Sequence, residues 1–329
     1  MNEPLLEVKS LKTSFRTDMG TVKAVDDISF TIHRGQILGI VGESGSGKSI
    51  TSQSILRLVG HKKSESVTGE IYFEGQDLLS LKERQMQRIR GKDISLIAQD
   101  PMTSLNPVYT VGNQIAEVPL IHEQMSKTSA WKKAIEMITR VGIPSSELRA
   151  KQYPHQFSGG MRQRGVIAMA LAGNPKLLIA DEPTTALDVT IQSQILELIR
   201  DLRDETGAGV MLITHDLGVV AEICDHVAVM YAGKIVEKAS VAELFSNPKH
   251  PYTKGLLASL PKLGNKERLK PILGQPPNLH NLSSGCAFAD RCPFVMEKCR
   301  EVQPLLQADK KGHQAACYLY EEEVRHAND

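Results

Sequence analysis

Residues 42–49 read Gly-Glu-Ser-Gly-Ser-Gly-Lys-Ser and match the phosphate-loop spacing G-x-x-x-x-G-K-[ST]. They follow an apolar run of strand length at residues 36–41, and residues 50–59 behind them have the pattern of a helix. In this context, glycines let the backbone turn its N–H groups toward an anion, and the helix start adds the positive end of its dipole. The pattern therefore favours a nucleoside triphosphate site over a Gly/Ser-rich turn that matches by accident.

Two side chains at the end of this loop supply further contacts of such a site. Lys48 can reach the terminal phosphates, and the hydroxyl of Ser49 can hold a magnesium ion. The residues expected to contact the nucleotide are Gly42, Ser44, Gly45, Gly47, Lys48 and Ser49.

The composition is that of an ordinary globular protein. The chain has 329 residues, and its 39 Lys and Arg nearly balance its 38 Asp and Glu. The net charge is too small to create an electrostatic field that attracts nucleic acid. The basic segment at residues 82–92 is interpreted as a solvated helix face. The N-terminus lacks a signal-peptide pattern, and the longest uncharged apolar run, residues 165–173, is too short to span a bilayer. We expect a cytosolic protein that reaches a membrane only through partner subunits.

The order of patterns along the chain predicts an α/β fold. Buried strand patterns alternate with helix patterns, which indicates a parallel, doubly wound sheet, and short alternating runs near the N-terminus predict an antiparallel β subdomain. The expected domains are a nucleotide-binding domain over residues 1–245, with a helical subdomain at about residues 100–165, a linker over 246–285 with one short helix, and a Cys-rich module over 286–329.

Polar residues follow several of the predicted strands directly. Asp181 can supply a carboxylate to magnesium, and Glu182 can orient or deprotonate an attacking water. Gln99 can bridge magnesium and water, and His215 can donate a hydrogen bond to a terminal phosphate. Alone, a Gln or His after a strand is more often structural, but the carboxyl ends of parallel strands meet at one edge of a sheet. We therefore expect these residues to belong to one site.

The succession of motifs resembles that of the ATP-binding cassette ATPases. The phosphate loop and Gln99 are followed by Ser158-Gly159-Gly160, by Asp181-Glu182-Pro183, by Thr185-Ala186-Leu187-Asp188 and by Thr214-His215-Asp216. Ser-Gly-Gly is the signature motif of that family, and Met161 stands where a Gln is often found.

This resemblance implies a P-loop NTPase core of the RecA-like type that hydrolyses ATP. It implies that two cassettes pack head to tail, so that the signature motif of one completes the ATP site of the other. Phe15 then lies where an aromatic ring stacks on adenine, although an edge-strand hydrophobe is the alternative. Asp188 is expected among the residues at the nucleotide.

Finer matches resemble the dipeptide/oligopeptide importer subfamily of these ATPases. They are residues 99–107, residues 153–156, and residues 250–253 followed by a Cys-containing tail. The resemblance implies a bacterial importer with two transmembrane permease subunits, an external peptide-binding protein and a second, non-identical ATPase. The chain is then peripheral, on the cytoplasmic face of the plasma membrane. Nickel, glutathione and antimicrobial peptides remain alternative cargoes.

A soluble cassette ATPase acting on nucleic acid or the ribosome is a rival function. Such proteins usually carry tandem cassettes, coiled-coil insertions or strong basic patches, and this sequence has none of these patterns.

Four of the five cysteines lie near the C-terminus. Cys286, Cys292, Cys299 and Cys317 lack the paired C-x-x-C knuckles typical of structural zinc, and some members of the resembled subfamily carry a four-iron cluster at these positions. The sequence leaves three alternatives for these cysteines: an iron–sulfur cluster, a zinc site or plain thiols. His313 is a candidate to replace one of the ligands. Cys224 is expected in the core.

Overall fold

The computed structural model describes residues 3–184, 188–260 and 271–321. Their contacts divide them into two compact units. Unit 1 contains the described residues of 1–6, 31–37 and 72–213, and unit 2 contains those of 7–30, 38–71 and 214–329.

Unit 2 carries the predicted strand, loop and helix. β3 (Ile37–Val41) is buried along its whole length, and α1 (Lys48–Ile55) begins directly after the loop. The prediction of a strand and a helix flanking residues 42–49 is therefore confirmed. The helix is shorter than expected, because Arg57 adopts a left-handed backbone conformation with φ 50°.

The strands of unit 2 continue outward from β3. β9 (His226–Tyr231) pairs with β3 in parallel, and β10 (Lys234–Ser240) pairs with β9 in antiparallel orientation. β12 (Gln314–Ala315) then pairs with β10, and β11 (Gln307–Ala308) pairs with β12, so these two short strands lengthen the sheet.

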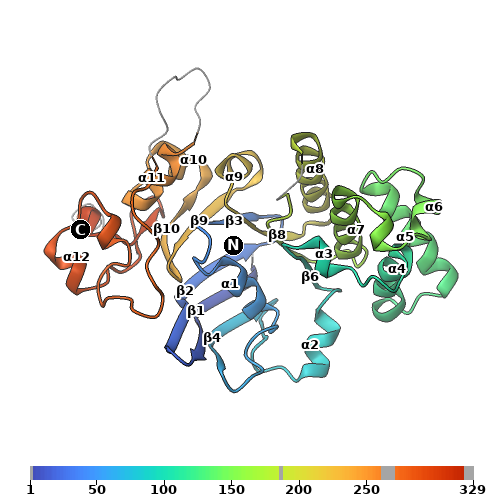
Figure 1. Ribbon diagram of the computed structural model, residues 1–329, viewed down its shortest axis with the longest axis horizontal. Helices are drawn as coiled ribbons and strands as arrows, with labels where there is room; N and C mark the ends of the chain where they lie inside the picture. Colours follow the sequence, from blue (N-terminus) through green and yellow to red (C-terminus); the bar gives the residue numbers. More distant parts are fainter. Residues whose placement is uncertain (1–2, 185–187, 261–270, 322–329) are drawn as a thin grey trace. The chain divides into compact units, whose positions relative to one another are not determined.

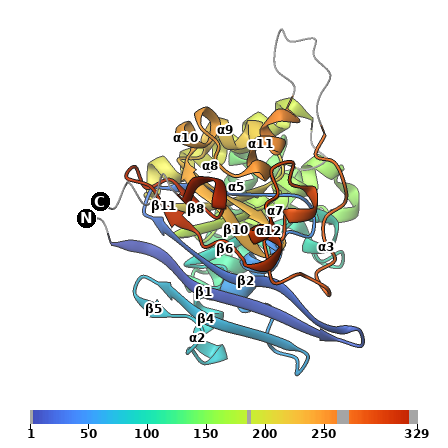
Figure 2. The ribbon, with the colours of Figure 1, turned by 90° about the vertical axis from the view of Figure 1, so that its left-hand side faces the viewer.

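Three helices cover one side of these strands. α9 (Leu217–Ile223), α10 (Val241–Ser246) and α11 (Pro251–Ala258) are grouped above β10 in both views (Figures 1 and 2), and all three contribute to one core cluster with β9 and β10. Valines of β9 and the rings of Tyr231, Tyr252 and Phe288 form the core between these elements and the C-terminal segment. The sequence patterns did not predict β10 and α10.

The N-terminal strands form a second sheet. β1 (Pro4–Thr17) and β2 (Gly20–His33) are joined by a two-residue turn, which makes them antiparallel neighbours, and β4 (Glu65–Phe73) follows β1 in the order β2-β1-β4. β5 (Gln76–Asp77) pairs with β4. The antiparallel strands expected near the N-terminus are therefore confirmed.

Unit 1 contains the parallel strands that the buried runs predicted. β6 (Ile94–Ile97), β7 (Leu177–Asp181) and β8 (Gly209–Thr214) lie side by side, and every residue of β7 and β8 is buried. Helices α7 (Gly159–Leu171) and α8 (Val189–Thr206) connect them, and α2 (Glu83–Ile89) precedes β6. The strands are parallel because a helical connection carries the chain back across the sheet before each new strand begins.

The insertion between β6 and α7 is helical, as predicted. It contains α3 (Pro101–Ser104), α4 (Val111–His122), α5 (Lys127–Arg140) and α6 (Ser146–Ala150), followed by the 3-10 turn η1 (Pro154–Gln156). Figure 1 shows α4, α5 and α6 gathered beside α7. The side chains of Thr110 and Ser126 accept hydrogen bonds at the starts of α4 and α5, which fixes where these helices begin.

The C-terminal cysteine segment, residues 286–321, is built from short elements. They are η2 (Ala289–Arg291), α12 (Glu297–Glu301), β11, β12 and η3 (Tyr318–Tyr320). Among the described residues, no helix has both the length and the hydrophobicity needed to cross a membrane.

Candidate functional site

The phosphate loop of unit 2 has a backbone that only glycine fits at two positions. Gly42 has φ 156° and Gly47 has φ 103°, and a Cβ at these residues would lie 2.2 Å from the carbonyl oxygen of Met230 and 2.3 Å from that of Ala24. Close packing of backbone on backbone therefore requires glycine at both ends of the turn. No acidic residue stands in the first turn of α1, so no local carboxylate offsets its dipole.

Lys48 lies inside the loop. Lys48 is 5% exposed, and its Nζ donates hydrogen bonds to the carbonyl oxygens of Gly42 (2.8 Å) and Glu43 (2.9 Å). These bonds hold a positive charge within the curve of the loop, where phosphate oxygens would meet it.

His215 belongs to the same unit as the loop. It is exposed and lines one pocket together with Gly42 and Glu43. The other residues of this pocket come from the end of β3, from the start of α9 and from the segment around α11: Val41, Leu217, Leu256, Ser259, Pro271 and Ile272. Phe15 lies in β1 of unit 2 and is partly exposed.

Unit 1 brings Gln99, Asp181 and Glu182 to the ends of β6 and β7. The Gln99 Nε2 donates to the Glu182 Oε2 at 3.2 Å, while Asp181 is the last residue of β7 and is 5% exposed. Glu182 has φ 49°, and its N–H donates to the carbonyl oxygen of Ile213 at 2.8 Å. Within this unit, Gln99 and Glu182 are therefore hydrogen-bonded, and Asp181 directly precedes Glu182.

Ser158, Gly159 and Gly160 form the start of α7. Ser158 is the N-cap, its Oγ accepts from the Met161 N–H at 3.4 Å, and both Ser158 and Gly159 are exposed. From the next turn of the helix, the Gln163 Nε2 donates to the Pro183 carbonyl oxygen at 2.8 Å. This bond ties the signature helix to the turn that carries Asp181 and Glu182, a connection that no motif spacing indicated.

Asp188 is the N-cap of α8. Its carboxylate accepts from the Ile191 N–H at 2.9 Å. Residues 185–187, the first three of the motif that ends at Asp188, lie outside the described residues.

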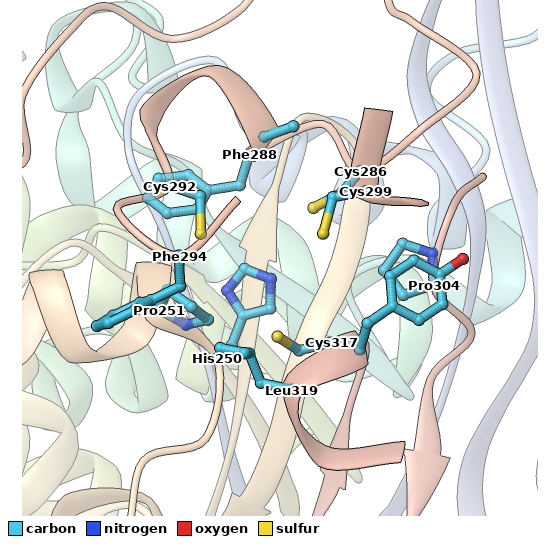
Figure 3. A pocket seen from close by; sticks show the side chains of 12 residues that line it. His250, Pro251, Cys286, Phe288, Cys292, Phe294, Cys299, Pro304, Cys317 and Leu319 are labelled. Atoms are coloured by element: carbon cyan, nitrogen blue, oxygen red, sulfur yellow. The ribbon is translucent and has the colours of Figure 1, made fainter. Parts of the chain in front are cut away.

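The four C-terminal cysteines line a single pocket in unit 2. Figure 3 shows the sulfur atoms of Cys286, Cys292, Cys299 and Cys317 turned toward the same space. His250, Phe288 and several other mainly apolar side chains complete the walls. Burial raises the pKa of the Cys286 and Cys317 thiols to about 11, and the neighbouring cysteines act in the same direction.

The expected metal at these cysteines is not supported. Across residues 3–184, 188–260 and 271–321, no three His, Cys, Asp or Glu side chains are arranged to hold a metal ion. His313, considered as a substitute ligand, instead places its Nε2 2.7 Å from the Glu237 carboxylate. Cys224 packs against the core cluster of unit 2, as expected, and burial raises the pKa of its thiol to about 12.

Two family models match the chain. The ABC transporter model matches residues 25–185, and the model of the oligopeptide/dipeptide transporter C-terminal region matches residues 236–299. The oligopeptide transport ATP-binding protein OppD of Bacillus subtilis (strain 168) is 57% identical over 317 residues, covering 96% of this chain and 88% of that protein. This chain belongs to the ABC transporter family.

Other relatives of this ABC transporter chain agree. The probable peptide ABC transporter ATP-binding protein y4tR of Sinorhizobium fredii (strain NBRC 101917 / NGR234) is 54% identical over 322 residues, covering 97% of this chain and 96% of that protein. Among solved structures, the dimeric post-hydrolysis state of the ATP-binding cassette MJ0796 bound to ADP and Pi aligns with a TM-score of 0.66 at 27% identity. That alignment covers 72% of this chain and 98% of the other.

These comparisons confirm the resemblance to ABC ATPases and to their dipeptide/oligopeptide importer subfamily. As a member of the ABC transporter family, the chain has the ABC ATPase fold and is an ATPase coupled to transport. The role of each site residue and the Cys-rich tail as a separate module stay predictions.

Proposed function

We propose that the chain is the ATP-hydrolysing subunit of an importer for dipeptides and oligopeptides. The observation that carries this proposal is the phosphate loop, whose backbone requires glycine and whose lysine lies within its curve. The peptide cargo is supported by the names of relatives that are more than half identical to this chain over nearly its full length.

In this proposal Glu182 orients or deprotonates the water that attacks the terminal phosphate. The hydrogen bond from Gln99 fixes the direction of its carboxylate. Lys48 and His215 stabilise charge on the phosphoryl group. Ser49, Gln99 and Asp181 are the residues that would hold magnesium, which neutralises negative charge on the phosphates when bound.

A second cassette completes the site in this proposal. Ser158 and Gly159 are exposed at the start of α7, so their hydroxyl and N–H groups are accessible to a phosphate that a partner brings. The related cassette MJ0796 was solved as a dimer bound to ADP and Pi. We infer a head-to-tail dimer, in which the second ATPase is a non-identical relative of this chain.

Glu182→Gln tests the proposed catalytic role. The substitution keeps the shape of the side chain and removes its ability to take a proton, so ATP binding should persist while turnover falls by at least about a hundredfold. The variant should also accumulate as a closed dimer in the presence of ATP and magnesium, measured by size-exclusion chromatography with light scattering.

Glu70→Gln is the matched control, because Glu70 is exposed in β4 and belongs to no candidate site. It should behave as the unaltered protein in both measurements. Unaltered ATP turnover in Glu182→Gln would refute the assignment.

Permease subunits are proposed to dock on the helical insertion. A groove between α4 and α5 is lined by Tyr109, Leu120, Lys127 and Trp131, and Tyr109 is 56% exposed. An exposed aromatic beside apolar and charged side chains suits a short helix from a membrane subunit. The chain would then lie on the cytoplasmic face of the membrane, with the external peptide-binding protein as an indirect partner.

An iron–sulfur cluster at the four cysteines is the last part of the proposal. The four thiols face one pocket, and each thiolate of a four-iron cluster binds a different iron atom, so its ligands stand farther apart than those of one ion. Zinc at the same four thiols is the alternative. The cluster would supply a rigid crosslink within the C-terminal cysteine segment.

A further inference from the structure

Glu43, the second residue of the phosphate loop, is bonded to a residue of the C-terminal cysteine segment. The Arg291 Nη1 lies 2.6 Å from the Glu43 Oε2, and the Arg291 Nη2 lies 3.0 Å from the Glu43 Oε1. These two parallel bonds form a bidentate ion pair between residues 248 positions apart in the chain. Arg291 stands between Cys286 and Cys292 and ends η2.

The guanidinium of Arg291 is held on its other sides as well. Its side chain is 6% exposed, and its Nε donates to the carbonyl oxygen of Leu273 at 3.0 Å. Its Nη1 also donates to the Tyr231 hydroxyl at 3.3 Å, and its Cζ lies within 5.9 Å of the ring centres of Tyr231 and Phe288. A buried, fixed guanidinium is a firm anchor, unlike an exposed ion pair, whose side chains move freely.

The backbone of Glu43 has a second anchor outside the loop. Its N–H donates to the Tyr252 hydroxyl at 2.8 Å, and Tyr252 is fully buried at the start of α11. The rings of Tyr252, Tyr231 and Phe288 pack on one another with centroid distances of 4.6 to 5.4 Å. The same aromatic cluster therefore supports both anchors of Glu43.

Fixing Glu43 also fixes the lysine of the loop. The Lys48 Nζ donates to the carbonyl oxygen of Glu43, so a shift of residue 43 moves an acceptor of the ammonium that is proposed to meet the phosphates. We propose that Arg291 is a positioning residue for ATP binding, which acts through Glu43 to hold the phosphate loop in its binding conformation. This inference rests on the proposed function of residues 42–49 and adds the C-terminal cysteine segment to the determinants of ATP affinity.

The test measures ATP affinity and turnover of the full chain with Arg291→Gln, Glu43→Ala and both together. Each single change should raise the Kd and KM for ATP about tenfold, because the loop loses one charge-assisted anchor. The kcat should change less than about twofold, because a loop that binds substrate and transition state alike affects KM and not kcat. Arg291→Lys should be intermediate, since an ammonium keeps the charge without the two parallel bonds.

Arg300→Gln is the matched control. Arg300 lies in the same segment, and its ion pair with Asp290 is exposed and does not touch the loop. This variant should keep the ATP affinity of the unaltered protein. Circular dichroism and thermal unfolding identify any variant that does not fold.

The double variant separates action through Glu43 from a general effect of charge. If Arg291 acts through Glu43, the Kd of the double variant for ATP should not exceed the higher Kd of the two single variants. An additive loss of about a hundredfold, or a Kd for Arg291→Gln equal to that of Arg300→Gln, would overturn the proposal.

Glu43→Ala and one further variant, Lys48→Ala, keep the result interpretable. If Arg291→Gln does not fold, Glu43→Ala alone decides, because it leaves the other bonds of Arg291 intact, and wild-type affinity in that variant overturns the inference. Lys48→Ala tests the underlying ATP site separately. Undiminished ATP binding in Lys48→Ala refutes the proposed function itself, whatever Arg291 does.

Discussion

Glu182 holds a backbone conformation that is unfavourable for a residue with a Cβ. Its φ of 49° lies in the left-handed region, which costs about 1–2 kcal/mol relative to ordinary helical or extended backbone. The hydrogen bonds of its N–H with Ile213 and of its carboxylate with Gln99 offset that cost. Strain of this kind persists where the surrounding structure fixes it, and it aims the carboxylate in one direction.

The proposed cluster at the four cysteines has a visible consequence. Anaerobically purified full-length protein should be brown and contain iron and sulfide, and Cys286→Ala should lower both, because a cluster needs its thiolate ligands. Iron and sulfide assays with visible absorption spectra provide the measurement. Cys224→Ala is the control, since Cys224 packs against the core cluster and is not among the residues that line the pocket. A colourless, iron-free protein that contains zinc would contradict the cluster.

At the scale of elements, a buried carboxylate joins β10 to the start of α11 and to the C-terminal strands. Glu237 of β10 is fully buried and accepts hydrogen bonds from the N–H groups of Lys249 and His250 at 2.6 and 2.8 Å. A further contact is with the His313 Nε2, just before β12. Burial alone would raise the pKa of Glu237, but these hydrogen bonds hold it below its usual range.

Glu237→Gln should lower the free energy of unfolding by about 1–3 kcal/mol at pH 7, because the new amide N–H₂ faces donors that need an acceptor. The folded-state pKa of Glu237 is depressed. Its ionic contribution is therefore fully present above the unfolded-state value of 4.5 and is lost as the pH falls through the folded-state pKa. Denaturant unfolding between pH 7 and pH 3 should show the difference between the two proteins shrinking below pH 4.5. A constant difference across that range, with Glu70→Gln as reference, would contradict the assignment.

At the scale of the whole molecule, the chain passes repeatedly between its two compact units. The phosphate loop and His215 belong to unit 2, whereas Gln99, the acidic pair and the signature helix belong to unit 1. Residues of one proposed chemistry therefore come from distant parts of the sequence. The insertion that carries the groove of α4 and α5 belongs wholly to unit 1.

The groove gives a prediction for the assembled transporter. Tyr109→Glu should abolish co-purification of the chain with two multi-spanning membrane proteins, because a charge replaces an exposed aromatic contact. The ATPase activity of the chain together with its partner ATPase should stay unchanged. Leu148→Glu is the control, since Leu148 is similarly exposed, at 61%, and does not line the groove. Normal assembly with Tyr109→Glu, or co-purification with nucleic acid, would contradict the proposed docking surface.

Local sequence patterns were enough to predict the phosphate loop, the parallel strands and the polar residues that follow them. These features follow from local causes: backbone that requires glycine, buried strand runs and helix caps. β10, α10 and the C-terminal elements were harder to predict, because they are short and their hydrophobic periodicity covers only a few residues.

The contacts between residues far apart in sequence became visible in the folded chain alone. It joined Arg291 to Glu43, Gln163 to the Pro183 carbonyl and Glu237 to His313, and it turned four cysteines toward one pocket. Residues this far apart in sequence meet because buried side chains must pack and buried polar groups must find partners. The phosphate loop was evident from its motif, but its support by the C-terminal cysteine segment depends on packing that no local pattern encodes.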